Sequence, residues 1–424
     1  SASHKAMNRP SVQALEDDTP SPSYGWVVMG FLGGMNFLIP MVSVSIGVML
    51  PAMTEDLSLS PMQAGLLGSI FFVGSASIAL PASIWLSRYS PKRMTTLSTF
   101  LAGAAALLQG WAPSFAVLLG ARLLFVLAVV SRLPAEVLLI QQWFSPRRVA
   151  LAISVTVGIF SVGQLLAIGL IPSLMSLLSG WRGVYYTLGI LLLVGAILWV
   201  IMGRERVHPS SQDGQAAGHP SPIGVLRRHK VVWLLAGCPA GAALAWASVI
   251  TFWPTHALES LPLSLTGVGA LMTLFPLGGI LASFLAGPLS DLVRQRKVFI
   301  WAPGILLPPL YVALFTTSSP LLAGILLFIA GWNAMIWVPI VRTIPFDMRL
   351  APRETVVVLG LFQTMMPIGG AIGPALVGII QQLSGSLQTG LLSIVAFPLT
   401  LVIGGLLIPE TSPHRRAPAA QSRE

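Results

Sequence analysis

The stretch GVYYTLGILLLVGAILWVIM-GRERVHPSSQDGQAAGHPSPIGVLRRHK, residues 183–230, decides the fold. Its first part, residues 183–202, carries no charged side chain, and about 20 consecutive apolar residues are enough for a helix to cross the hydrocarbon core of a bilayer. Its second part, residues 203–230, is the longest polar stretch between apolar segments of the chain. Six apolar segments precede this polar stretch and six follow it. The sequence therefore predicts two halves with equal numbers of membrane-spanning helices.

The composition of the whole chain excludes several classes of protein. Of the 424 residues, 54% are hydrophobic and only 9% are charged, whereas an average soluble domain is about 25% charged. So few charges cannot cover the surface of a soluble protein of this length, and the apolar content excludes a disordered chain. The single cysteine, Cys238, excludes internal disulfides, and the six histidines show no metal-binding spacing. We therefore expect a polytopic membrane protein that lies in the lipid bilayer and needs no cofactor or metal.

The apolar segments predict an all-α membrane protein, because the short alternating patterns of a transmembrane β-barrel are absent from the sequence. Residues 24–202 are expected to form an N-terminal six-helix bundle, and residues 231–408 a C-terminal six-helix bundle. Residues 203–230 form a cytoplasmic linker, residues 1–23 a disordered cytoplasmic N-tail and residues 409–424 a cytoplasmic C-tail. The twelve predicted helices cover residues 25–50, 62–86, 94–112, 114–143, 149–178, 183–202, 231–256, 264–290, 298–317, 320–347, 355–384 and 387–408.

Basic residues gather on one side of the predicted membrane. Twenty of the 24 lysine and arginine residues fall in the two tails, the linker and alternate loops. The loops of the opposite side hold only Arg182, which lies beside the acidic Glu55, Asp56 and Glu259. Such a bias is typical of cytoplasmic loops, so we expect both termini in the cytoplasm and the chain in the cell (inner) membrane. Because the basic residues are explained as signals of membrane topology, the net charge of +10 does not indicate a nucleic-acid partner.

The two halves repeat one another. Ser87 opens the basic loop after the second predicted helix and Asp291 the loop after the eighth, an offset of 204 residues. Ser-Pro-Arg-Arg at 145–148 corresponds to Ala-Pro-Arg-Glu at 351–354, an offset of 206 residues. Landmarks that agree this closely indicate a duplicated six-helix unit. In transporters built from such repeats, the substrate binds near the membrane midplane between the repeats.

Residues 287–297, GPLSDLVRQRK, resemble the loop motif G-x-L-x-D-R-x-G-R-R of the major facilitator superfamily. The first-half copy at 83–92, SIWLSRYSPK, has a serine in place of the aspartate. Three further features resemble the family: WFSPRR at 143–148, GWRG at 180–183, and Arg122 early in the fourth predicted helix. The chain is therefore identified as a member of this superfamily of secondary transporters, whose fold consists of two pseudo-symmetric six-helix bundles. The resemblance extends over essentially the whole chain.

The resemblance also indicates a branch of the superfamily and gating roles for two residues. PSYGWVV at 22–28 and the stretch at 143–152 are similar to the monocarboxylate and oxalate/formate branch, although Ser283 stands where that branch carries an arginine in the eighth helix. In the family, the loop aspartate stabilises the outward-facing state. The resemblance thus implies gating roles for Asp291 and for Arg88 in the first-half copy. The alternative is that Asp291 is only a solvated loop charge.

Charged residues within predicted helices are the main candidates for the site. An arginine at the centre of a membrane helix costs about 2.5–3.5 kcal/mol even on insertion scales, so each needs a partner or a wet cavity. Arg132 and Glu136 are four residues apart, lie on one helix face and can pair. The repeat offset of 206 residues places Arg342 opposite Glu136. Arg122 is expected to have a packing role.

The family resemblance implies that the first, fourth, seventh and tenth helices line a central cavity, in which Arg132, Glu136 and Arg342 would converge. Arginine matches the planar geometry of a carboxylate, so Arg132 and Arg342 are predicted to bind a small organic anion. Glu136 is predicted to couple transport to a proton. The alternative is a buried ion-pair cluster that only ties the two halves together. Other side chains predicted to complete the substrate pocket are Asn36, Trp253, Trp332, Asn333 and Gln363.

The sequence favours a proton-coupled secondary transporter, a symporter, that moves a small organic anion by alternating access. Two alternatives stay open: an exporter of amphipathic or drug-like solutes that uses the tryptophan-rich helices, and a membrane-embedded sensor or enzyme on the same fold. Catalysis would need a nucleophile and a base close together, and the sequence holds no Ser/His/Asp constellation or phosphate-binding glycine loop. We therefore expect no enzyme. The expected partners are an anionic small molecule, protons and the bilayer.

Overall fold

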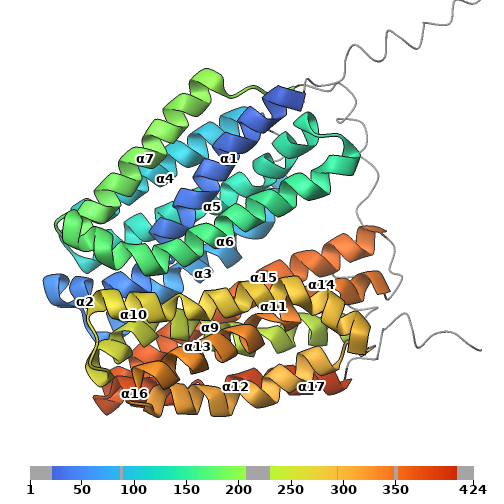
Figure 1. Cartoon of the computed structure of the whole chain (residues 1–424). Helices are drawn as coiled ribbons and strands as arrows, with labels where there is room; N and C mark the ends of the chain where they lie inside the picture. Colours follow the sequence, from blue (N-terminus) through green and yellow to red (C-terminus); the bar gives the residue numbers. More distant parts are fainter. Residues whose placement is uncertain (1–21, 86–88, 207–229, 294, 348–351, 408–424) are drawn as a thin grey trace, which may run out of the picture.

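The computed structural model describes residues 22–85, 89–206, 230–293, 295–347 and 352–407. These residues are almost entirely helical and include no strand. The predicted N-tail, C-tail and most of the predicted linker lie outside the described residues. Figure 1 shows the described helices in two groups, one coloured from blue to green and the other from yellow to red. This confirms the predicted all-α membrane fold of two helical bundles.

The N-terminal half contains the helices α1 to α7. Their bounds are α1 Pro22–Ser43, α2 Ile46–Leu57, α3 Pro61–Trp85, α4 Pro91–Trp111, α5 Phe115–Trp143, α6 Pro146–Leu177 and α7 Trp181–Met202. Proline in the first turn, where a helix has no use for the missing N–H, marks the start of several of them. At α4, the Ser90 hydroxyl also accepts a hydrogen bond from the Arg93 amide and so satisfies one free donor of the helix start.

The C-terminal half contains α9 to α17. Their bounds are α9 Lys230–Ser260, α10 Leu265–Met272, α11 Leu274–Val293, α12 Val298–Thr316, α13 Pro320–Met335, α14 Trp337–Asp347, α15 Pro352–Ser384, α16 Leu387–Leu392, the short 3-10 helix η4 Phe397–Leu399 and α17 Thr400–Leu407. Within the described residues, ten segments are long and apolar enough to span a membrane. The helices α4 and α9, of 21 and 31 residues, coincide with the other two of the twelve predicted spans.

Several predicted spans are interrupted, which corrects their description as single helices. The span predicted at 25–50 breaks after Ser43, and its second part, α2, continues to Leu57. The break between α10 and α11 lies four residues before Pro276, and the break between α13 and α14 lies four residues before Pro339. Since proline removes the hydrogen bond to the carbonyl four residues earlier, it frees the last carbonyl of each preceding helix.

The two halves pack together near the membrane surface that carries the loop around Ser58–Ser60. The Ser69 hydroxyl of α3 accepts a hydrogen bond from the Ala375 amide of α15 at 3.0 Å. Glycines allow the helices to approach, since a Cβ atom on Gly65 would lie 2.4 Å from the Pro374 carbonyl oxygen. A Cβ atom on Gly47 of α2 would lie only 2.0 Å from the Ile250 carbonyl oxygen of α9. We infer that these close backbone contacts seal this side of the interface between the halves.

Candidate functional site

The break between α1 and α2 is held by a buried arginine of α5. The Arg122 guanidinium donates from Nη2 to the Ser43 carbonyl at 2.7 Å and from Nε to the Leu67 carbonyl of α3 at 3.0 Å. Its remaining nitrogen, Nη1, makes no hydrogen bond within the described residues. Arg122 thus joins the interrupted first span to α3 through backbone carbonyls.

A second buried arginine of α5 lies in a cluster with two residues that the sequence singled out. Arg132 and Glu136 form an ion pair, with Arg132 Nη2 at 2.9 Å from Glu136 Oε2. Asn36 of α1 bridges the two, because its Oδ1 accepts a hydrogen bond from Arg132 and its Nδ2 donates one to Glu136 Oε1 at 2.7 Å. The predicted pairing of Arg132 with Glu136 is therefore present in the structure. We call Asn36, Arg132 and Glu136 the α1–α5 cluster.

The α1–α5 cluster is buried but retains unused donors. Arg132 is 1% exposed and both Asn36 and Glu136 are 6% exposed, so the charges are shielded from water and depend on one another. Arg132 Nε and Nη1 make no hydrogen bond within the described part of the chain. A buried donor without a partner costs about 1–3 kcal/mol. These two nitrogens are therefore suited to an additional acceptor such as a carboxylate oxygen.

No hydrogen bond or ion pair links Arg342 to the α1–α5 cluster within the described residues. Arg342 lies in α14 with an exposed side chain and makes no hydrogen bond or ion pair within the described residues. The convergence of Arg342 with Arg132 therefore stays a prediction. Of the predicted gating residues, Asp291 lies exposed near the end of α11, whereas Arg88 lies outside the described residues.

The other predicted pocket residues are spread over the C-terminal half. Trp253 is buried in α9, and Trp332 is half-buried in α13. The Asn333 amide nitrogen donates a hydrogen bond to the Ile329 carbonyl of its own helix at 2.9 Å. The side chain of Gln363 lies outside the described part of the structure. Their roles in substrate binding stay predictions.

A small cavity of about 70 Å³ lies between the two halves, beside Arg122. A volume of this size admits a few water molecules. One end is aromatic, and the Phe72 ring of α3 meets the Trp246 ring of α9 edge to face with centroids 6.5 Å apart. The polar side chains of its wall include Gln164 of α6 and Thr251 of α9. Sequence reasoning gave Gln164 no role, although a lone amide in the apolar segment 149–178 was the available signal.

Replacing Gly47 by alanine should disfavour the close packing of α2 against α9 that joins the two halves. The added methyl group would overlap the Ile250 carbonyl, and such overpacking costs about 1–3 kcal/mol, or roughly a 5- to 150-fold shift in a two-state equilibrium. The readout is labelling of a cysteine at Val44, which lines the cavity, by an impermeant maleimide added on the side of Asp56 and Arg182, in a chain without Cys238. We expect faster labelling and slower transport.

Gly30→Ala is the matched control, since a Cβ atom there would meet nothing within 4 Å. Its labelling and transport rates should equal those of the parent chain. Equal labelling of the Gly47 and Gly30 variants would contradict the inference that the Gly47–Ile250 contact closes this side.

Comparisons with known proteins agree with the helical arrangement. A family model described as Major Facilitator Superfamily matches residues 32–244 and again residues 236–423. The Cupriavidus necator protein named "Probable sulfoacetate transporter SauU" is 22% identical over 389 residues, which cover 85% of this chain and 88% of the relative. The Bacillus subtilis protein named "Probable galactarate/D-glucarate transporter GudP" is 24% identical over 430 residues, covering 90% of this chain and 92% of the relative.

A solved structure shares the fold. It is a bacterial homologue of the human lysosomal transporter Spinster in an inward-facing, unoccupied conformation. The two structures superpose with a TM-score of 0.76 at 19% sequence identity, over 90% of this chain and 94% of the other. Because the sequences differ so much, this likeness concerns the fold alone. The chain is accordingly a multi-pass membrane protein with a known transporter architecture.

Proposed function

Because the chain belongs to the major facilitator superfamily and is a membrane transporter rather than an enzyme, we propose that it moves a small organic anion together with a proton by alternating access. The observation that carries this proposal is the buried α1–α5 cluster of Asn36, Arg132 and Glu136. A cation, an acid and an amide on facing helices form a compact site in which a substrate anion and a proton can replace one another.

Arg132 is the proposed anchor of the anion. A guanidinium binds a carboxylate or sulfonate through parallel N–H donors, and such charge-assisted bonds are about twice as strong as neutral ones. Within the described residues, Nε and Nη1 make no hydrogen bond, and each of them forms a parallel pair of donors with Nη2. The third guanidinium nitrogen, Nη2, donates a hydrogen bond to the Asn36 amide oxygen. An incoming substrate oxygen could replace this amide oxygen. A substrate that captures Arg132 would weaken the ion pair with Glu136.

Glu136 is the proposed coupling residue. A buried charge that loses its partner is strongly destabilised, so a proton would neutralise Glu136 when the anion binds Arg132. For a monoanion, the anion and the proton then cross without net charge. Return of the empty transporter would require release of the proton and restoration of the Arg132–Glu136 pair. The buried location of both residues supports this exchange, since water cannot screen either charge.

The names of the relatives support an anionic substrate. One relative is named for sulfoacetate and another for galactarate and D-glucarate, and all of these carry carboxylate groups. The basic bias of the predicted loops supports a location in the inner membrane with both termini in the cytoplasm. The second candidate function, export of amphipathic solutes, draws support from the aromatic wall of Phe71, Phe72 and Trp246.

Uptake into proteoliposomes with an alkaline interior tests the proposal. The purified chain should accumulate labelled sulfoacetate or D-glucarate above the level of protein-free vesicles, because the site pairs an anion with a proton. A neutral nucleoside and a lipophilic cation serve as comparison solutes. Transport of the lipophilic cation without transport of either anion would contradict the proposal and favour the amphipathic exporter.

A further inference from the structure

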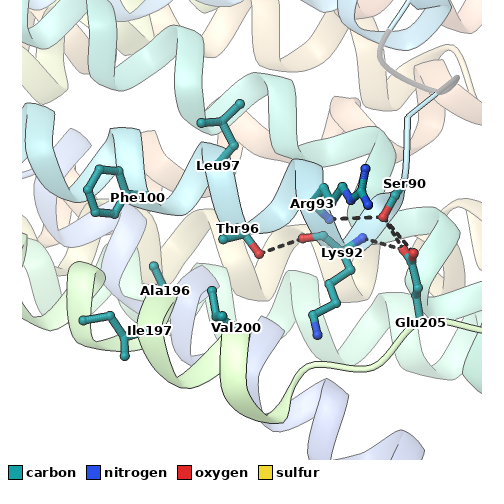
Figure 2. Close-up of a pocket in the computed structure, with 10 residues that line it drawn as sticks. All are labelled: Ser90, Lys92, Arg93, Thr96, Leu97, Phe100, Ala196, Ile197, Val200 and Glu205. Carbon is teal, nitrogen blue, oxygen red and sulfur yellow. Dashed lines mark hydrogen bonds between the residues drawn. The ribbon is translucent and has the colours of Figure 1, made fainter.

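A groove on the outside of the N-terminal half has no part in the proposed substrate route. It has a volume of about 660 Å³ and runs between α4 and α7. These helices pack against each other and against α1, α5 and α6 of their own half. Figure 2 shows Lys92 and Arg93 at one end of the groove, with Leu97 and Phe100 following along α4 and Ile197 and Val200 on the facing helix.

The walls of the groove are apolar and exposed. Leu97, Phe100, Ile197 and Val200 are each more than half exposed, at 53%, 51%, 55% and 51%. Both helices belong to the membrane-spanning bundle, so these side chains face the hydrocarbon chains of lipid rather than water. The distance from Lys92 to Phe100 along α4 is about 12 Å at 1.5 Å per residue. A groove of this length can hold the upper part of one acyl chain.

The end of the groove is positively charged. Lys92 and Arg93 lie in the first turn of α4, and neither side chain forms an ion pair within the described residues. The acid that lines the groove, Glu205, caps α4: both of its oxygens accept hydrogen bonds from the Ser90 hydroxyl, at 2.8 and 2.6 Å, and one accepts from the Lys92 amide at 2.9 Å. Glu205 keeps its negative charge, so Lys92, Arg93 and Glu205 together give this end of the groove a net charge of +1, and the side-chain donors of the two cations remain for an anion from outside the chain.

We infer that this groove binds one anionic phospholipid, with its phosphate at Lys92 and Arg93 and an acyl chain along the apolar walls. The charges stand at the start of a spanning helix, on the side of the membrane where the basic loops gather, which is the level of lipid phosphates. Basic pockets between spanning helices on that side recognise anionic headgroups. The combination of cations at the interface with an apolar channel below them matches the two parts of a phospholipid.

Native mass spectrometry of the detergent-purified chain, titrated with phosphatidylglycerol, tests this inference. The change is Lys92→Ala with Arg93→Ala, which keeps the backbone amides that bind Glu205 and Ser90, so the cap of α4 survives. Losing two cations near the headgroup should weaken phosphatidylglycerol binding on the order of thirty-fold. Phosphatidylcholine should bind the parent chain more weakly than phosphatidylglycerol does.

Two further variants make the test specific. Arg148→Ala removes an exposed cation on the same side of the membrane, at the start of α6 and outside the groove, and should leave binding unchanged. Val200→Trp fills the groove and should weaken binding while both cations remain. If Arg148→Ala and the double variant lost phosphatidylglycerol affinity equally, the attraction would be unspecific and the proposed site would be wrong. Unchanged phosphatidylglycerol binding by the double variant would also exclude the site.

Discussion

Replacing Arg132 by alanine should strongly reduce uptake of the organic anion. The substitution removes the proposed anchor and leaves Glu136 buried with only the Asn36 amide as a partner. Truncating one member of a buried charge pair costs about 2–5 kcal/mol, which lowers uptake at low substrate concentration by roughly 30-fold or more. The measurement is the initial rate of anion uptake into proteoliposomes at equal protein density, with the stability of the variant followed by thermal unfolding in detergent.

Two variants separate binding from folding. Arg132→Ala combined with Glu136→Gln removes both charges, so it should unfold at a higher temperature than Arg132→Ala alone but still fail to transport. Arg132→Lys keeps the charge and loses the planar fork, so the chain should fold and transport with a raised KM. Parental uptake by a folded Arg132→Ala variant would show that Arg132 only ties α5 to α1.

Replacing Glu136 by glutamine should abolish accumulation and spare exchange. Glutamine preserves an acceptor for Asn36 and fills the same volume, but it cannot carry a proton. With the membrane potential held at zero by valinomycin and equal potassium concentrations, a gradient of one pH unit is worth about 1.4 kcal/mol and drives roughly tenfold accumulation of an anion that crosses with one proton. The internal substrate concentration should therefore not rise above the external one in the variant. Exchange of internal for external substrate should continue because Arg132 is still present.

The matched control is Glu259→Gln, which removes an exposed carboxylate near the end of α9. This variant should accumulate substrate like the parent chain. Should Glu136→Gln still concentrate the anion in response to the pH gradient, then Glu136 is a structural partner of Arg132 and proton coupling depends on another group.

The sequence predicted those parts of the site that depend on local spacing. The pair of Arg132 and Glu136 follows from a separation of four residues on one helix, and it is present at 2.9 Å. Asn36 could be selected as a polar residue in an apolar segment, but its bridging contacts depend on how α1 crosses α5. That crossing results from tertiary packing and cannot be predicted from the helical periodicity of the sequence.

Other features required the three-dimensional arrangement. The break after Ser43 is coupled to Arg122, whose guanidinium reaches it from α5, and nothing in the local sequence marks that contact. By contrast, Pro276 and Pro339 were readable signals for the later breaks, each four residues after the last residue of a helix. Repeat symmetry placed Arg342 at an equivalent position of its own half, but equivalent positions touch only if the halves meet there.

The claim that the chain moves an organic anion together with a proton is tested most directly by measuring the proton movement that accompanies anion entry. Proteoliposomes that contain the parent chain and an internal pH-sensitive dye would receive sulfoacetate and D-glucarate in turn, without an imposed gradient. The account predicts that a transported anion acidifies the interior as it enters, and that the Glu136→Gln variant, in vesicles preloaded with the unlabelled anion, exchanges the same anion without acidification. Entry of the anion into parent vesicles at constant internal pH would contradict the account.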